Sequence, residues 1–309
     1  MSAPPVAASS SSKPSVIRPR RSALYMPGFN ARALEKARTL PADVLILDLE
    51  DAVAPESKDI ARRQVHAAVT AGGYGPREIV IRVNAAGTPW YEEDMAAAIS
   101  AAPDAILIPK VGHPDELAAI GRRLELAAAP ARTRVWAMME TPLGMLNAAQ
   151  IARAKLDHPE SRLSVLVLGT NDLAKETRAE IVPERWTMLP WLMTCVAAAR
   201  AYGLEVLDGA YNNFRDESGL RREAEQGKEM GMDGKTVIHP DQVVPVNQIF
   251  SPSPADVASA QRIMDAFEKP ENKGRGVITV DGRMVELLHA EMAARTVAIA
   301  KAIANHAGA

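Results

Sequence analysis

Two acidic residues from separate parts of the sequence are candidates for binding a metal ion. Glu140 and Asp172 each follow a short apolar run that is typical of a buried strand. If these runs are neighbouring parallel strands, the two carboxylates lie at one edge and repel each other unless a cation lies between them. Mg²⁺ binds one or two carboxylates and completes its octahedron with water and substrate oxygens. The alternative is that each acid caps the following helix, although Thr141 and Asn171 are available for that role.

A second group of charged residues also lies in or after apolar runs. Asp48, Glu50 and Asp51 fall within four positions, and could orient metal-bound water or form a structural polar network. Arg82 lies inside an apolar strand, where a guanidinium needs a partner. It could bind a substrate carboxylate or enolate oxygen, or form an ion pair with Asp48 or Glu50. Lys110 is compatible with a Schiff base, but the acidic cluster should raise its pKa and keep it protonated.

A third group is basic. Asn30 is a predicted helix N-cap, and Arg32 and Lys36 are four residues apart, so that they share one face of the helix. Near a helix N-terminus they could hold the phosphates of a nucleotide, and the alternative is a solvated basic edge. His239 follows another apolar run and fits a core position, a loop or a ligand contact equally. The sequence has no serine-hydrolase, Walker or zinc-protease motif, which disfavours those activities.

All these residues depend on a repeated pattern of elements. Short apolar runs alternate with longer Ala-rich segments, at a spacing of about 20 to 40 residues that leaves room for a helix and two loops. We predict an α/β fold, a TIM (β/α)₈ barrel, whose strand ends meet at one active face. The predicted strands are 22–26, 44–49, 79–83, 105–108, 135–139, 163–168, 205–207 and 235–238.

The two ends of the chain differ from this pattern. Residues 1–17 are rich in Ser, Pro and Ala and are predicted to be a disordered tail, which leaves 18–250 for the barrel. Residues 251–309 are predicted to form a helix that begins at Ser253-Pro254, a hairpin with Asp281-Gly282 at its turn, and a terminal helix. We expect this hairpin-helix extension to be a lid over the mouth of its own barrel or of a neighbouring subunit.

Composition excludes several classes of protein. A net charge of -2 gives no general attraction to nucleic acid or to a membrane surface. The single cysteine, Cys195, excludes a disulfide framework and suits the cytoplasm. No apolar run approaches the roughly 18 residues that span a bilayer.

The motifs together resemble the HpcH/HpaI aldolase and citrate lyase beta-subunit family, and especially its stand-alone malyl-CoA and citramalyl-CoA lyases. The resemblance extends from about Arg21 to the C-terminus and is more specific for the family than for the substrate. The motifs that carry it, in order, are RSALYMPGFN, DVLILDLEDAV, IVIRVN, ILIPKV, METPLG, LVLGTNDLA and DGKTVIHPDQ.

The resemblance implies roles for particular residues. Glu140 and Asp172 would bind Mg²⁺, with Mn²⁺ as an alternative, and Arg82 would contact the substrate. The family forms trimers or hexamers with a catalytic acid in the C-terminal segment, where Glu286 replaces the usual aspartate and the following proline is absent. Its carboxylate therefore reaches further by about one methylene. The CoA site would comprise Tyr25, Arg32, Lys36, Ile238 and His239.

The implied activity is Mg²⁺-dependent cleavage or formation of a carbon-carbon bond in a 3-hydroxyacyl-CoA, with an acyl-CoA and a 2-oxo acid as small-molecule partners. Two alternatives stay open. One is a malyl-CoA thioesterase on the same scaffold, and the other is a citrate lyase beta subunit acting on a carrier-bound citryl thioester. We expect the C-terminal extension to argue against the second, because such subunits resemble a shorter form without it.

Overall fold

The computed structural model describes residues 17–307. Arg20–Ser251 form one compact unit, and the described residues after Ser251 belong to a second. The predicted disordered tail, residues 1–17, lies outside the described range apart from Ile17. Within that range no helix is both long and apolar enough to cross a membrane.

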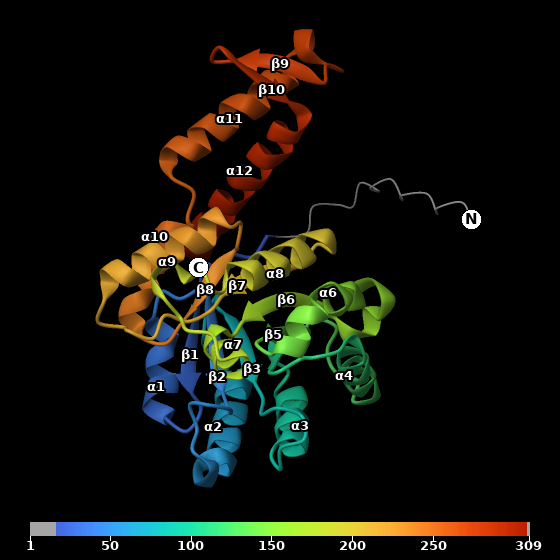
Figure 1. Cartoon of the computed structure of the whole chain (residues 1–309), viewed down its shortest axis with the longest axis vertical. Coiled ribbons are helices and arrows are strands. Elements are labelled where there is room, and N and C mark those ends of the chain that lie inside the picture. Colours follow the sequence, from blue (N-terminus) through green and yellow to red (C-terminus); the bar gives the residue numbers. More distant parts are fainter. Residues whose placement is uncertain (1–16, 308–309) are drawn as a thin grey trace, which may run out of the picture. The chain divides into compact units, whose positions relative to one another are not determined.

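Eight parallel strands close into a barrel, with each strand beside the next along the chain and β8 beside β1 (Figure 1). The predicted TIM barrel is confirmed, and each predicted strand matches an observed one to within one residue at either end. The strands are β1 Ser22–Pro27, β2 Val44–Asp48, β3 Glu78–Arg82, β4 Ala105–Ile108, β5 Arg134–Met139, β6 Leu163–Leu168, β7 Glu205–Asp208 and β8 Gly234–Val237.

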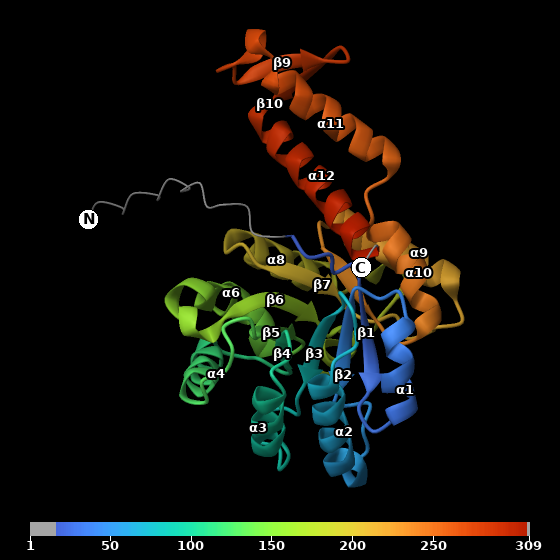
Figure 2. The same cartoon turned by 180° about the vertical axis from the view of Figure 1, so that it is seen from behind.

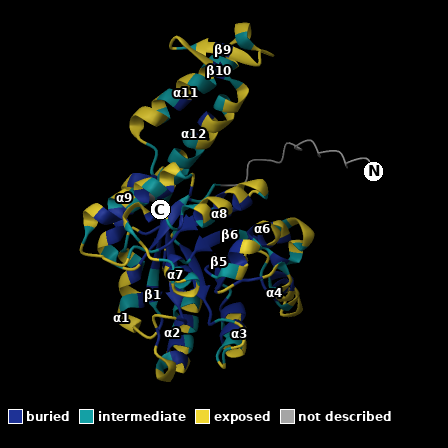
Figure 3. Ribbon diagram, viewed as in Figure 1, coloured by how far each residue is buried: buried dark blue, intermediate teal, exposed yellow. Residues whose placement is uncertain are grey.

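Both faces of these strands are apolar. Ile46 and Val80 belong to the cluster inside the barrel with Trp136, whereas Leu45 and Leu47 pack in the outer core that includes the helices. Figure 3 shows the strands buried and the outer faces of the helices exposed. Because parallel strands covered on both sides leave little room for polar side chains, the charged groups collect mainly at the strand ends.

Helices and short 3₁₀ turns connect the strands. Several begin with a side-chain cap, including α1, where Asn30 accepts a hydrogen bond from the Ala33 N–H as predicted. The α-helices are α1 Ala31–Lys36, α2 Lys58–Ala71, α3 Tyr91–Ala101, α4 Pro114–Leu126, α5 Pro142–Leu146, α6 Ala148–Asp157, α7 Thr170–Thr177, α8 Leu189–Ala201, α9 Glu217–Glu229 and α10 Val243–Phe250. The 3₁₀ turns are η1 Ala37–Thr39, η2 Pro55–Ser57, η3 Pro159–Ser161, η4 Pro183–Arg185, η5 Pro240–Gln242 and η6 Pro270–Asn272.

The second unit contains the three elements predicted for the C-terminal segment. Helix α11 (Pro254–Glu268) begins with a capping box between Ser253 and Asp256. Strands β9 (Val277–Val280) and β10 (Arg283–Glu286) pair as a hairpin whose turn residues, Asp281 and Gly282, have positive φ. Helix α12 (Leu287–Ala307) follows, and a small apolar cluster joins α11 to α12. The lid role stays a prediction.

Candidate active site

A cavity of about 300 Å³ lies at the carboxyl ends of the barrel strands. This is the face on which TIM barrels build their active sites. Residues from both sides of the barrel line it, so side chains distant in sequence are brought together. Five residues predicted for the site are among them, namely Tyr25, Arg82, Glu140, Asp172 and Ile238.

Glu140 is a buried carboxylate that makes no ion pair with any residue of the described range, 17–307. Its Oε1 accepts a hydrogen bond of 2.8 Å from the backbone N–H of Lys110. Burial, together with the charges of Glu50 and Asp172, raises the pKa of Glu140 to about 8. Gly169 makes the position possible, because a Cβ there would collide with the Glu140 carboxylate. A cation in this cavity would therefore stabilise the ionised form.

The capping alternative fails for Glu140. Thr141 is the N-cap of α5, where its hydroxyl accepts from the Gly144 N–H. Asp172 lies in the first turn of α7, where the helix dipole favours it, and it also lines the cavity. Among residues 17–307 no three Asp, Glu, His or Cys side chains converge as metal ligands. Two carboxylates fit Mg²⁺, which completes its shell with water and substrate oxygens.

Arg82 is held in place by the acidic run after β2. Its Nε and Nη2 each donate to the Asp48 carboxylate at 2.7 Å, and its Nη1 donates to Asp51 at 3.2 Å. Burial lowers the pKa of Arg82, but Asp48, Tyr25 and Glu50 together raise it by more, so the guanidinium stays charged. The ion pair that the sequence left open is thus confirmed with both Asp48 and Glu50, and Asp48 also accepts hydrogen bonds. A contact with substrate stays a prediction.

Glu50 is less well satisfied than Asp48. Asp48 also accepts from the backbone N–H groups of Glu50 and Ala52, as a structural network requires. Glu50 Oε2 lies 3.0 Å from Arg82 Nη1, but without hydrogen-bond geometry, and it is buried with no hydrogen-bond partner. Burial, together with the charges of Asp51 and Asp48, raises the pKa of Glu50 to about 7. Acidic groups whose ionised form is disfavoured therefore lie close to the cavity.

Two lysines, Lys110 and Lys58, lie close to these acidic residues. Burial lowers the pKa of Lys110, but the surrounding acids, with Glu50 and Asp172 foremost, together raise it by more, so the lysine is protonated as predicted and unsuited to a Schiff base. The sequence analysis assigned no role to Lys58, whose buried Nζ donates to the carbonyls of Leu49 and Glu50 at 2.8 and 2.7 Å. A lysine in the first turn of a helix opposes the helix dipole, and that was the available signal.

The remaining predicted residues do not line the cavity. Arg32 and Lys36 are exposed on α1, which also fits a solvated basic edge. His239 caps η5 through its Nδ1 and stacks against Phe214. Glu286 lies at the end of β10 in the second unit, where its backbone N–H donates to His289 Nδ1.

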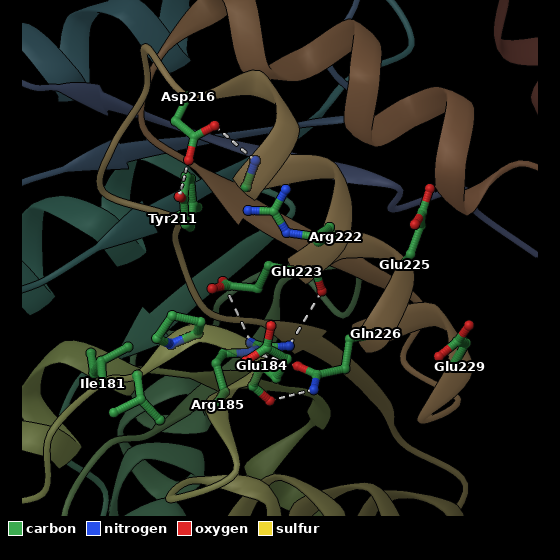
Figure 4. Close-up of a pocket in the computed structure, with 13 residues that line it drawn as sticks. Ile181, Glu184, Arg185, Tyr211, Asp216, Arg222, Glu223, Glu225, Gln226 and Glu229 are labelled. Carbon is green, nitrogen blue, oxygen red and sulfur yellow. Dashed lines mark hydrogen bonds and ion pairs between the residues drawn. The ribbon is translucent and has the colours of Figure 1, made fainter.

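A larger cavity of about 560 Å³ lies between η4 and α9 (Figure 4). Its buried cation, Arg185, already donates to Asp208 at 2.7 Å and to Gln226 at 2.9 Å. None of the residues predicted for the metal or thioester lines it. We expect the chemistry in the smaller cavity, because its buried Glu140 makes no ion pair within residues 17–307 and has a raised pKa.

Comparisons with known proteins show the family to which the chain belongs. A model of the HpcH/HpaI aldolase/citrate lyase family matches residues 21–240. The chain is 51% identical over 286 residues to (3S)-malyl-CoA thioesterase of Cereibacter sphaeroides, covering 93% of this chain and 96% of that protein. It is 33% identical over 298 residues to citrate lyase subunit beta of Leuconostoc mesenteroides, covering 94% and 95%. The structure of CitE from Mycobacterium tuberculosis with magnesium, acetoacetate and coenzyme A has a TM-score of 0.70 and 28% identity, covering 89% of this chain and 97% of that one.

The alignment with citrate lyase subunit beta corrects one expectation. Since it covers 94% of this chain, it includes most residues after Ser251. That subunit does not lack the C-terminal segment, so the segment cannot argue against a carrier-dependent role. The predicted family itself is confirmed: the chain belongs to the HpcH/HpaI aldolase/citrate lyase family of enzymes.

Proposed function

We propose that the chain is a Mg²⁺-dependent enzyme acting on the CoA thioester of a 3-hydroxy acid, such as malyl-CoA or citramalyl-CoA. The observation that carries the proposal is the presence of Glu140, Asp172 and Arg82 in one cavity. The names of the relatives support the substrate class, and the magnesium and coenzyme A in the CitE complex support the cofactor and the thioester.

Glu140 and Asp172 would hold the ion, with Mn²⁺ as an alternative. When bound, Mg²⁺ would polarise the oxygens of the hydroxy acid and lower the pKa of its hydroxyl group. The chain's own contribution is orientation. The Lys110 N–H fixes one oxygen of Glu140, and Gly169 leaves space for the carboxylate.

Arg82 has the same task in either possible reaction. Negative charge develops on the thioester carbonyl oxygen when water adds to it, and also when a carbon-carbon bond breaks to leave an enolate. A guanidinium fixed by Asp48 needs no reorganisation to stabilise that charge. Tyr25, whose ring lies 4.7 Å from the guanidinium carbon, restricts its position further.

Hydrolysis of malyl-CoA is the reaction we favour. It consumes water and yields malate and free CoA, and the 51% identity over nearly the whole chain to a malyl-CoA thioesterase supports it. Carbon-carbon cleavage to glyoxylate and acetyl-CoA is the second candidate, because the family includes a citrate lyase subunit over the same length. In cleavage the enolate carbon takes up a proton, and Glu286 is our candidate donor.

We further propose a cytoplasmic homo-oligomer, a trimer or hexamer, in which Glu286 comes from a neighbouring copy. Leu287, Leu288 and Met292 are at least half exposed just beyond Glu286, and a neighbouring surface would cover them. For carbon-carbon cleavage, in which we expect Glu286→Gln to be inactive, mixing this variant with Glu140→Gln should restore part of the activity, since hybrid oligomers contain intact sites. No recovery after exchange of subunits would contradict this arrangement.

The reaction is tested with malyl-CoA and Mg²⁺, by following free thiol and glyoxylate in parallel. Thiol release without glyoxylate identifies hydrolysis, and glyoxylate with acetyl-CoA identifies cleavage. Both should stop when EDTA removes the metal. Inactivity on every CoA ester, with activity on a carrier-bound citryl thioester, would refute the proposal and indicate a citrate lyase subunit.

A further inference from the structure

The loop between β7 and α9, residues 211–216, carries an exposed aromatic ring beside the metal-site cavity. Phe214 is 43% exposed, although its ring stacks on the imidazole of His239, with centroids 4.7 Å apart and planes 16° apart. Asn212 of the same loop lines the cavity, as does Ile238, which directly precedes His239. The two stacked rings therefore adjoin the cavity wall.

Hydrogen bonds hold this loop in one conformation. The Tyr211 hydroxyl donates to Asp216 at 2.8 Å, and Asp216 in turn caps α9 by accepting from the Gly219 N–H at 2.9 Å (Figure 4). Asn212 and Asn171 exchange hydrogen bonds of 2.8 and 3.1 Å between their side chains. A ring on a fixed loop loses little conformational entropy when a ligand binds to it.

Arg215 places a positive charge next to the ring. Its guanidinium carbon lies 5.7 Å from the centroid of Phe214. The side chain is exposed and makes no hydrogen bond or ion pair with the residues that the structure describes. It can therefore move aside without breaking a polar contact. An aromatic face beside an available cation is suited to a nucleotide, because bases stack on rings and phosphates pair with guanidinium groups.

We propose that Phe214 and Arg215 are nucleotide-binding residues of the thioester site: the adenine of CoA stacks on Phe214, and Arg215 pairs with the ribose 3′-phosphate. The inference rests on the proposed function and extends it to two residues that do not line the cavity. His239 acts as the support of the ring, because its Nδ1 is engaged as the cap of η5. The acyl group then lies towards the cavity and the nucleotide at its rim.

Calorimetric titration with free CoA tests the inference without requiring turnover. Phe214→Ala should weaken CoA binding about tenfold, as expected for loss of one stacked base, and Phe214→Trp should restore it. Arg215→Met should weaken binding of CoA about fivefold and of 3′-dephospho-CoA much less, since only the former has the 3′-phosphate. Matched controls are Trp186→Ala and Arg122→Met, which remove an exposed ring and an exposed cation elsewhere.

A second readout separates binding from damage to the fold. The KM for an acyl-pantetheine substrate, which lacks the nucleotide, should be unchanged in Phe214→Ala while the KM for the acyl-CoA rises about tenfold. Equal increases for both substrates, or CoA affinity equal to wild type, would overturn the inference and leave the proposed function intact. If the wild-type protein does not bind CoA, the proposed function fails, and this inference with it.

Discussion

Two buried carboxylates of the barrel differ in the charge around them. Asp208, at the end of β7, is 0% exposed, and Glu140, just after β5, is 1% exposed. Burial raises the pKa of Asp208, but Lys235 and Arg185 lower it by more, so its net shift is downwards. The pKa of Glu140 instead rises to about 8. Asp208 is paired with cations of its own chain, whereas Glu140 makes no ion pair within residues 17–307, and we propose that a bound metal ion supplies its counter-charge.

The largest effect should come from disturbing the satisfied site. Asp208→Asn leaves the buried Lys235 and Arg185, which donate to Asp208 at 2.9 and 2.7 Å, without their counter-charge. We expect a loss of about 3 to 5 kcal/mol in the free energy of unfolding, measured with urea. The control is Glu217→Gln, which removes an exposed ion pair with Arg221 and should cost less than about 1 kcal/mol. If the two substitutions lowered the free energy of unfolding equally, the buried ion pairs of Asp208 would not be more important than an exposed one.

Glu140→Gln should reduce activity and not stability. Burial disfavours the ionised form of Glu140, and glutamine avoids this cost, so the unfolding free energy of the metal-free protein should stay the same or rise. Activity should fall at least about a hundredfold, which corresponds to about 2.7 kcal/mol of transition-state stabilisation. Steady-state kinetics on malyl-CoA check this, with the exposed Glu125→Gln as control. Full activity in Glu140→Gln would remove this residue from the mechanism.

Gly169→Ala should produce a smaller, local effect. Its Cβ would meet the Glu140 carboxylate and displace it. We expect Mg²⁺ to bind about tenfold more weakly, with a loss of stability of about 1 to 3 kcal/mol. The control is Gly276→Ala, where the added Cβ has no neighbour within 4 Å. Unchanged metal affinity would mean that Mg²⁺ binding does not depend on where the Glu140 carboxylate lies.

The pH dependence of stability should show the contribution of Asp208. Because its pKa is lower in the folded chain than in the unfolded one, its ion pairs stabilise fully above pH 4, near the unfolded value of 3.8. This contribution is lost as the pH falls through the lower, folded value. Urea unfolding between pH 7 and pH 3 should show a steeper decline below pH 4 for wild type than for Asp208→Asn. If the stabilities of wild type and Asp208→Asn declined in parallel with falling pH, the loss below pH 4 would not come from Asp208.

Much of the fold could be predicted because each strand is a local apolar signal. The runs 44–49 and 163–168 are buried on both faces, and turn or cap residues such as Asn30 and Asp281-Gly282 mark the neighbouring boundaries. These patterns depend only on nearby residues. The strand order follows from the handedness and closure of a βα repeat, so it too needed no knowledge of side-chain contacts.

The pairing of charges could not be predicted in the same way. Arg82 had several acids within reach in the sequence. The register of β2 on β3 places Asp48 directly beside Arg82, and this decides that Asp48 accepts two of its hydrogen bonds. Arg185 was not singled out, because it reaches Asp208 from a loop in which Glu184 and Arg185 adopt positive φ without any glycine to signal it. Such contacts depend on loop conformation, which single residues do not encode.

Calorimetric titration of the metal-free protein with Mg²⁺ tests the central claim most directly, because it does not depend on the identity of the substrate. We expect one binding site in wild type and in Glu125→Gln, and no detectable binding in either Glu140→Gln or Asp172→Asn. If both of the latter variants bound Mg²⁺ as tightly as wild type, the two carboxylates would not be the metal ligands.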